Sequence, residues 1–135
     1  MTSHEKIELE FYSSPESLKD LENIFVTLTS NLDIETQDLA RIKLCFYESV
    51  TNAIRHGNQF DPKKKIYITR AFLPSKIEFY IRDEGKGFDL DNIKNPLEEE
   101  NINKPCGRGV FFIKQFCKST IYCNKRKVLK LEFEI

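Results

Sequence analysis

Two polar residues, Glu48 and Asn52, lie four positions apart in a segment whose apolar residues recur every three or four positions. This repeat predicts an amphipathic helix over residues 35–56, and the spacing puts both side chains on one face of it. A carboxylate can act as a general base, and an amide oxygen is a suitable ligand for Mg²⁺. Arg55, further along the same helix, completes this first group. A solvated polar face is the alternative interpretation.

The sequence contains only five glycines, and all of them fall at the end of that helix or in two Gly-x-Gly elements. Glycine lacks a Cβ and therefore lets a ligand approach the backbone closely. The first element follows an apolar segment and contains Asp83, Gly85 and Gly87. An Asp at the floor of a pocket can accept a hydrogen bond from an exocyclic amine such as that of adenine, and the glycines leave space for the flat ring. An ordinary turn at a strand end is the alternative.

The second glycine element opens a predicted helix over residues 107–118. Exposed N–H groups at the positive end of a helix dipole bind phosphate, whereas a flexible helix start is the alternative. The segment before it, residues 88–106, is charged and irregular, and about nineteen residues of this kind in a compact domain are more typical of a functional lid than of a passive connector. The candidate phosphate contacts here are Lys104, Gly107, Arg108, Gly109 and Val110.

The remaining elements position these three groups. Apolar residues at helical spacing predict a first helix over residues 15–31, with Ser14 as N-cap and Pro15 at its first position. Gly57 and Asn58 should end the second helix. Alternating polar and apolar residues predict strands over residues 5–12, 65–73, 76–82, 119–124 and 128–135.

Composition narrows the class of protein. A chain of 135 residues with 40% hydrophobic residues is expected to form a single domain, 1–135, with its own core. Lys and Arg together number 21, as do Asp and Glu, so no global field favours nucleic acid or an anionic membrane. The longest uncharged stretch, Ile24 to Leu32, is far shorter than the roughly 20 residues of a membrane span. With no signal-peptide pattern at the N-terminus, we expect a cytoplasmic protein.

The four cysteines, at positions 45, 106, 117 and 123, match no zinc-ligand spacing. We therefore expect reduced, mostly buried thiols.

Taken together, the three groups resemble the N-box and the two glycine boxes of the Bergerat-type (GHKL) ATP-binding domains. The resemblance covers nearly the whole chain, and the segments around Asn52 and Asp83 look most like the bacterial anti-sigma factor serine/threonine kinases. It implies an α+β fold: a two-layer sandwich with a mixed, mostly antiparallel sheet, about three helices on one face and an ATP lid at about residues 88–106.

The resemblance also implies roles for individual residues. Glu48 would be the general base toward a serine hydroxyl, and Asn52 would hold Mg²⁺ against the phosphates of ATP or ADP. Asp83 would contact the adenine amine. Gly85 and Gly87 would line the adenine side, and residues 107–109 would face the phosphates.

Two departures from the family pattern concern the ligand contacts. Pro105 and Cys106 stand where related kinases often have an Arg before the second glycine box, which leaves Lys104 and Arg108 as substitutes. The last predicted strand lacks the usual Gly-Thr, whose Thr assists at adenine, so adenine contact is completed differently or more weakly.

The implied function is an ATP-dependent anti-sigma factor that binds a sigma factor and phosphorylates a serine on a STAS-type antagonist protein. A nucleotide-binding partner-switch module with little or no kinase activity is the alternative. A histidine-kinase fragment is disfavoured, because no phosphoacceptor-histidine helix pair precedes the domain. The apolar residues of the first helix belong to the core, and any surplus could form a homodimer surface.

Overall fold

The computed structural model describes residues 5–85, 119–123 and 128–135. The described strands form one sheet with the order β1-β2-β3-β5-β4, and each pairing of neighbours is antiparallel. The α+β prediction is confirmed. The strands are β1 (Glu5–Tyr12), β2 (Lys65–Leu73), β3 (Lys76–Arg82), β4 (Ser119–Cys123) and β5 (Val128–Glu134).

The strand predictions agree closely with this sheet. The first three predicted ranges match β1, β2 and β3 residue for residue, and β4 and β5 each end one residue earlier than expected. β2 and β3 form the predicted hairpin, in which Leu73 pairs with Lys76 across the Pro74-Ser75 connection. The predicted helix over residues 107–118 and the predicted lid lie outside the described residues.

The first helical segment begins where the sequence predicts but differs in its first turns. A 3-10 helix, η1 (Pro15–Asp20), precedes the α-helix α1 (Leu21–Thr29), so the predicted range of 15–31 is two residues too long and wrong about the type of helix at its start. Ser14 is the N-cap, and its backbone N–H donates to Ser17 Oγ at 3.1 Å. Pro15 fits the first helical position because it has no N–H to leave unpaired.

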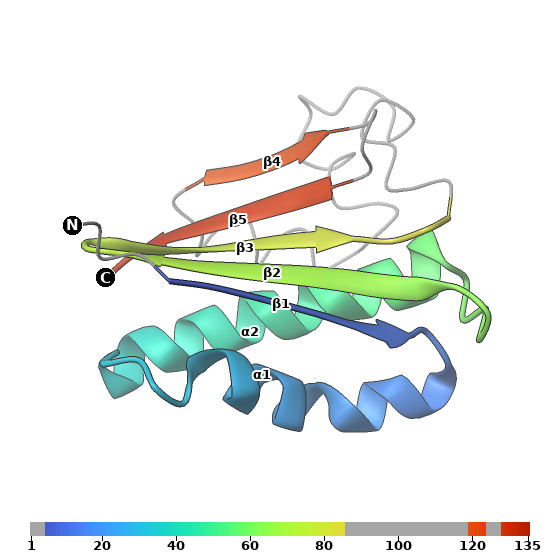
Figure 1. Ribbon diagram of the computed structural model, residues 1–135, viewed down its shortest axis with the longest axis horizontal. Coiled ribbons are helices and arrows are strands. Elements are labelled where there is room, and N and C mark those ends of the chain that lie inside the picture. Colours follow the sequence, from blue (N-terminus) through green and yellow to red (C-terminus); the bar gives the residue numbers. More distant parts are fainter. Residues whose placement is uncertain (1–4, 86–118, 124–127) are drawn as a thin grey trace.

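The second helix spans nearly the predicted range, in two parts. α2 (Thr36–Asn52) is a regular α-helix, and it continues without a break into a π-helical turn, η2 (Ala53–Gly57). Figure 1 shows α1 and α2 running along the sheet on the same side of it.

The core lies between these helices and one face of the sheet. Buried aromatic rings cross both layers: Phe25 of α1 meets Phe46 of α2 at 5.2 Å between centroids, and Phe46 meets Phe79 of β3 at 5.3 Å. Phe79 in turn contacts Phe133 of β5 at 6.3 Å. Rings at these separations and tilts pack favourably, so the chain of four aromatics fixes α2 against the centre of the sheet.

One buried cation interrupts this apolar face. Arg70 of β2 is 1% exposed, and its Nη1 donates to the carbonyl of Leu28 at 2.8 Å, in the last turn of α1. The guanidinium thus satisfies a carbonyl at the helix C-terminus, where a positive charge is favourable. Burial lowers the pKa of Arg70 from its ordinary value, but the side chain stays charged.

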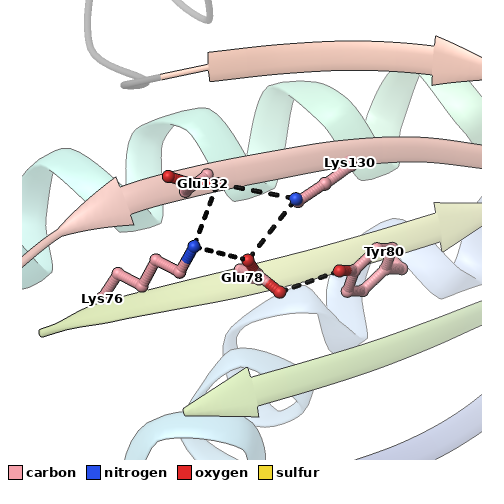
Figure 2. Close-up of polar contacts among 5 residues, drawn as sticks. All are labelled: Lys76, Glu78, Tyr80, Lys130 and Glu132. Atoms are coloured by element: carbon pink, nitrogen blue, oxygen red, sulfur yellow. Dashed lines mark hydrogen bonds and ion pairs between the residues drawn. The ribbon is translucent and has the colours of Figure 1, made fainter. Parts of the chain in front are cut away.

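The opposite face of the sheet carries charged residues that pair with one another (Figure 2). Lys76 Nζ lies 3.3 Å from Glu78 and 3.6 Å from Glu132, and Lys130 Nζ lies 3.4 Å and 3.5 Å from the same two carboxylates. The Tyr80 hydroxyl donates to Glu78 at 2.8 Å. We call these five residues of β3 and β5 the open-face cluster. Each member has at least one partner within it.

Candidate functional site

A pocket lies where the C-terminal part of α2 meets the ends of β3 and β5. Ser49, Asn52 and Ala53 contribute to it from successive positions on the helix face that packs on the sheet. This spacing of three and four residues is the one that aligns side chains along an α-helix. The other side of the pocket is formed by Gly57, Ile81, Asp83 and Leu129.

The helix wall ends in the π-helical turn η2. Asn58 N donates to the carbonyl of Ala53, five residues back, at 2.9 Å, and Phe60 N donates to the carbonyl of Ile54 at 2.8 Å. Such wide turns are rare and occur frequently at functional sites. Here the turn ends at Gly57, which lies against Asp83, the residue after β3.

Gly57 and Gly85 lie at positions where there is no space for a Cβ atom. A Cβ on Gly57 would lie 2.4 Å from Asp83 Oδ2, and one on Gly85 would lie 1.6 Å from the carbonyl oxygen of Gly57. The residues with left-handed backbone after the helix are instead Gln59, with φ of 55°, and Phe60, with φ of 60°. The predicted helix end at Gly57 is correct, but the physical reason for the glycine is its contact with Asp83.

Asp83 is held firmly at the floor of the pocket. It is 5% exposed, and its Oδ1 accepts a hydrogen bond from the backbone N–H of Gly85 at 2.9 Å. The carboxylate therefore closes its own turn while lining the pocket. The absence of a side chain on Gly85 makes room for the carbonyl of Gly57.

A buried amide, Asn58, ties this turn to the neighbouring strands. Its Oδ1 accepts a hydrogen bond from Glu84 N at 2.8 Å, and its Nδ2 donates to Ser13 Oγ and to the carbonyl of Lys65, both at 3.0 Å. The side chain is 1% exposed. Asn58 thus connects the end of β1, the start of β2 and the residue after Asp83 through three hydrogen bonds.

Glu84 clamps the same turn from its other side. Its carboxylate accepts hydrogen bonds from Lys65 N at 3.0 Å and from the hydroxyl of Tyr67 at 2.5 Å. These two bonds lower the pKa of Glu84 below its ordinary value, the Tyr67 bond contributing most. The turn that follows Asp83 is therefore held by the protein's own hydrogen bonds.

Two buried polar atoms in the pocket have no hydrogen-bond partner among the described residues: Ser49 Oγ and Asn52 Nδ2. Ser49 is 2% exposed and Asn52 is 6% exposed. A buried polar group without a partner costs about 1–3 kcal/mol, so it points to a ligand that supplies the missing bond. The only other atom of this kind in the described part of the chain is Arg70 Nε, whose guanidinium is anchored at Leu28.

Comparison with protein families identifies the domain. The model of the histidine kinase-like ATPase domain matches residues 11–133. The chain belongs to this family. The residues that line the pocket suit the base of the ATP that such a domain uses: they include an anchored carboxylate, two polar groups without a partner among the described residues, and the apolar side chains of Ile81 and Leu129 against which a flat ring can pack.

Curated relatives of this ATPase domain carry the name anti-sigma F factor. The protein from Shouchella clausii is 38% identical over 66% of the chain, and that from Oceanobacillus iheyensis is 37% identical over 67%. The matches span 62% and 63% of those relatives, less than two thirds of their length. A Clostridium perfringens protein of the same name is 28% identical over 93% of the chain and 92% of its own length.

The structure brings some of the predicted site residues of this ATPase domain together and leaves others apart. Asn52 and Asp83 line one pocket, whereas Glu48 is half-buried and does not line it, and Arg55 is exposed. The other predicted contacts lie outside the described residues: Gly87, Lys104, Gly107, Arg108, Gly109 and Val110.

Three residues at the site were not singled out from the sequence as ligand-binding or positioning groups: Ser49, Gly57 and Asn58. For Ser49 a signal was available, since it is a polar residue on the same stripe as the buried Ile42 and Phe46. Gly57 and Asn58 give no such signal, because the contact of Gly57 with Asp83 and that of Asn58 with Glu84 each join residues 26 positions apart.

Other findings bear on the remaining predictions. Cys45 is a buried free thiol, and in the described part of the chain no group of three His, Cys, Asp or Glu residues could hold a metal ion. Within the described ranges, no helix is long and apolar enough to cross a membrane.

Proposed function

We propose that this ATPase domain is an anti-sigma factor that binds a sigma factor and uses ATP to phosphorylate a serine on a STAS-type antagonist protein. The observation that carries the proposal is the pocket of Asp83, Asn52 and Ser49, in which an anchored carboxylate faces buried polar atoms without partners. The names of the relatives support the choice of partners and substrate.

Asp83 is suited to bind the base of the nucleotide. Its Oδ1 is already engaged by Gly85 N, and a buried carboxylate accepts further hydrogen bonds readily. The exocyclic amine of adenine is such a donor. Ile81 and Leu129 supply apolar surface for the ring, and both belong to the strands that also fix Phe79 and Phe133 in the core.

Asn52 is suited to the phosphate end of the ligand. Its amide is buried at the pocket and its nitrogen is not engaged by the described residues. When bound, Mg²⁺ neutralises phosphate charge, and it takes few ligands from a protein, the rest coming from water and phosphate. A single amide oxygen from Asn52 is consistent with this coordination preference of Mg²⁺. Arg55, Lys104 and the second glycine box, including Arg108, complete the phosphate contacts in this proposal.

Glu48 is the proposed general base. It lies one helical turn before Asn52, at the four-residue spacing that brings Cβ atoms to about 5–6 Å from one another. It does not line the pocket and is half-buried, so part of the side chain is exposed to a hydroxyl that arrives on a partner protein. Glu48 accepts the proton of the incoming serine as the phosphoryl group is transferred.

The test is transfer of radiolabel from the γ-phosphate of ATP to a purified STAS-type antagonist. Glu48→Gln should lower the transfer rate by about 10²–10⁴-fold and leave ATP affinity unchanged, because the amide cannot accept the proton. Glu35→Gln is the matched control, since Glu35 is an exposed carboxylate at the N-cap of the same helix. It should transfer at the normal rate.

Equal transfer by Glu48→Gln and the wild type would remove Glu48 from the mechanism. If the wild type binds ATP and the antagonist but transfers no label, the chain is a nucleotide-binding partner-switch module and not a kinase.

A further inference from the structure

Ser49 has a hydroxyl that the protein itself does not use. The side chain lines the pocket, the residue is 2% exposed, and Oγ has no hydrogen-bond partner among the described residues. It lies on α2 one turn before Ala53 and three residues before Asn52, which line the same wall.

The same protein shows what a helical hydroxyl ordinarily does. In α1, Thr27 Oγ1 donates to the carbonyl of Asn23 at 2.9 Å, and Thr29 Oγ1 donates to that of Phe25 at 2.8 Å. Both are bonds to the residue four positions back, the usual way for Ser and Thr to satisfy a hydroxyl within a helix. Ser49 does not make this bond although it is more deeply buried than Thr29, which is 7% exposed. Its hydroxyl is therefore available to a ligand.

The composition of the pocket indicates which part of a nucleotide meets this hydroxyl. The pocket combines an acceptor, Asp83, with apolar surface from Ala53, Ile81 and Leu129. A planar base with an amine fits this combination. In adenine the amine lies between two ring nitrogens, N1 on one edge and N7 on the other, and each of them is a hydrogen-bond acceptor. A neighbouring donor is then needed, and β5 contributes only the apolar Leu129 to the described lining.

We propose that the Ser49 hydroxyl is a base-specificity group that donates a hydrogen bond to the adenine ring nitrogen beside the amine bound by Asp83. The inference rests on the proposed ATP site. It assigns recognition of the base to two elements, with Asp83 at the end of β3 accepting from the amine and Ser49 of α2 donating to the ring.

The experiment measures calorimetric affinities for ATP and for its 1-deaza and 7-deaza analogues, each of which replaces one ring nitrogen with a C–H group. The wild type is compared with Ser49→Ala. Thr51→Ala is the matched control, since Thr51 is a half-buried hydroxyl on the same helix that does not line the pocket. The thermal midpoint of each protein without nucleotide is measured in parallel.

Ser49→Ala should bind ATP about 5–10-fold more weakly than the wild type, the value of one hydrogen bond. One of the two analogues should bind the wild type more weakly by a similar factor and show no further loss with Ser49→Ala. The thermal midpoint of nucleotide-free Ser49→Ala should equal or exceed that of the wild type, because removal of an unpaired buried hydroxyl does not destabilise the fold. Thr51→Ala should bind all three ligands like the wild type.

Wild-type affinity of Ser49→Ala for ATP would overturn the proposal. So would an equal loss by Ser49→Ala for ATP and both analogues, since the hydroxyl would then not contact either ring nitrogen. A lower thermal midpoint together with weaker binding would assign Ser49 a structural role instead. If the wild type fails to bind ATP, the proposed function fails with the inference, whereas normal wild-type binding confines any failure to Ser49.

Discussion

Two groups of buried polar residues in this protein contrast in how they are satisfied. In the open-face cluster, the carboxylates of Glu78 and Glu132 are each met by two lysines, and Glu78 is also met by Tyr80 (Figure 2). In the pocket, Ser49 Oγ and Asn52 Nδ2 have no partner among the described residues. The first group is satisfied by the fold itself, and in our proposal the nucleotide satisfies the second.

The contrast extends to the titration of the open-face cluster. Burial raises the pKa of Glu78, but the hydrogen bond from Tyr80 and the two lysines outweigh it, so the pKa lies below its ordinary value of 4.5. Burial and the hydrogen bond to Glu78 raise the pKa of Tyr80 to about 12. Each group is thus held in the protonation state that its partners require. We conclude that burial alone does not mark a functional polar residue here, and that Ser49 and Asn52 stand out because their buried atoms without a partner also line the pocket.

The largest effect is expected from Gly85→Ala, which forces the two sides of the pocket apart. The new Cβ would lie 1.6 Å from the carbonyl oxygen of Gly57, a backbone atom that cannot move alone. We expect a loss of about 3 kcal/mol in the free energy of unfolding, measured by urea denaturation, and loss of ATP binding.

Gly57→Ala separates the two effects. Its Cβ would meet the side chain of Asp83, at 2.4 Å from Oδ2, and not the backbone. It should therefore destabilise the fold less than Gly85→Ala but still abolish ATP binding by displacing the carboxylate. Normal ATP affinity in Gly57→Ala would contradict the assigned role of Asp83.

The next largest effect is expected from Asn58→Ala, which removes the tie between the pocket and the edge of the sheet. The variant loses three hydrogen bonds at a residue that is 1% exposed, and leaves Glu84 N without this acceptor. We expect a loss of about 2 kcal/mol in the free energy of unfolding and about 10-fold weaker ATP binding.

Asn58→Asp tests the directional part of this claim, because it keeps an acceptor for Glu84 N and loses the donor to Ser13 and Lys65. It should recover more of the ATP affinity than of the stability. Equal recovery of both would show that Asn58 acts on the pocket only through overall stability.

Glu78→Gln should affect stability alone. It removes a charge that Lys76, Lys130 and Tyr80 share, and we expect a loss of about 1 kcal/mol in the free energy of unfolding. ATP affinity should not change, since Glu78 does not line the pocket. Weaker ATP binding by folded Glu78→Gln would contradict the claim that the open-face cluster stabilises the fold and takes no part in ATP binding.

The smallest expected effect is that the stability lost in Glu78→Gln depends on pH. Because the pKa of Glu78 is lowered in the fold, its contribution to stability is present above pH 4.5 and is lost as the pH falls through its folded value. We would measure the free energy of unfolding of the wild type and of Glu78→Gln by urea denaturation at several pH values. The difference between the two proteins should be constant from neutral pH down to about pH 4.5 and should shrink below pH 4.5. A difference that grows on acidification would have the wrong sign for this account.

Most of the fold was predictable from the sequence because it follows local patterns. The alternation in residues 65–73 and 76–82 and the Pro74-Ser75 turn define a hairpin without reference to distant residues. The type of helix at the start of the first helical segment was not predictable in this way, since the 3-10 turn depends on side-chain bonds between Ser14 and Ser17.

The site was predictable only in part. Asn52 and Asp83 were found because a polar residue at helical spacing and an Asp before a Gly-x-Gly element are visible in the sequence. The π-helical turn and the close approach of Gly57 to Asp83 were not visible, because they arise from packing between segments 26 residues apart. The contacts of Asn58 with Ser13 and Glu84 were not visible for the same reason, and the sequence indicates only that Asn58 follows a helix.

The most direct test of the central claim is a calorimetric titration of ATP with Mg²⁺ into the wild type and Asp83→Asn. Asp33→Asn is the matched control, since it makes the same change at an exposed carboxylate away from the pocket. The account predicts binding by the wild type and Asp33→Asn and loss of binding by folded Asp83→Asn. Equal binding by all three proteins would contradict it, because the nucleotide would then lie elsewhere than at the buried carboxylate between α2 and β3.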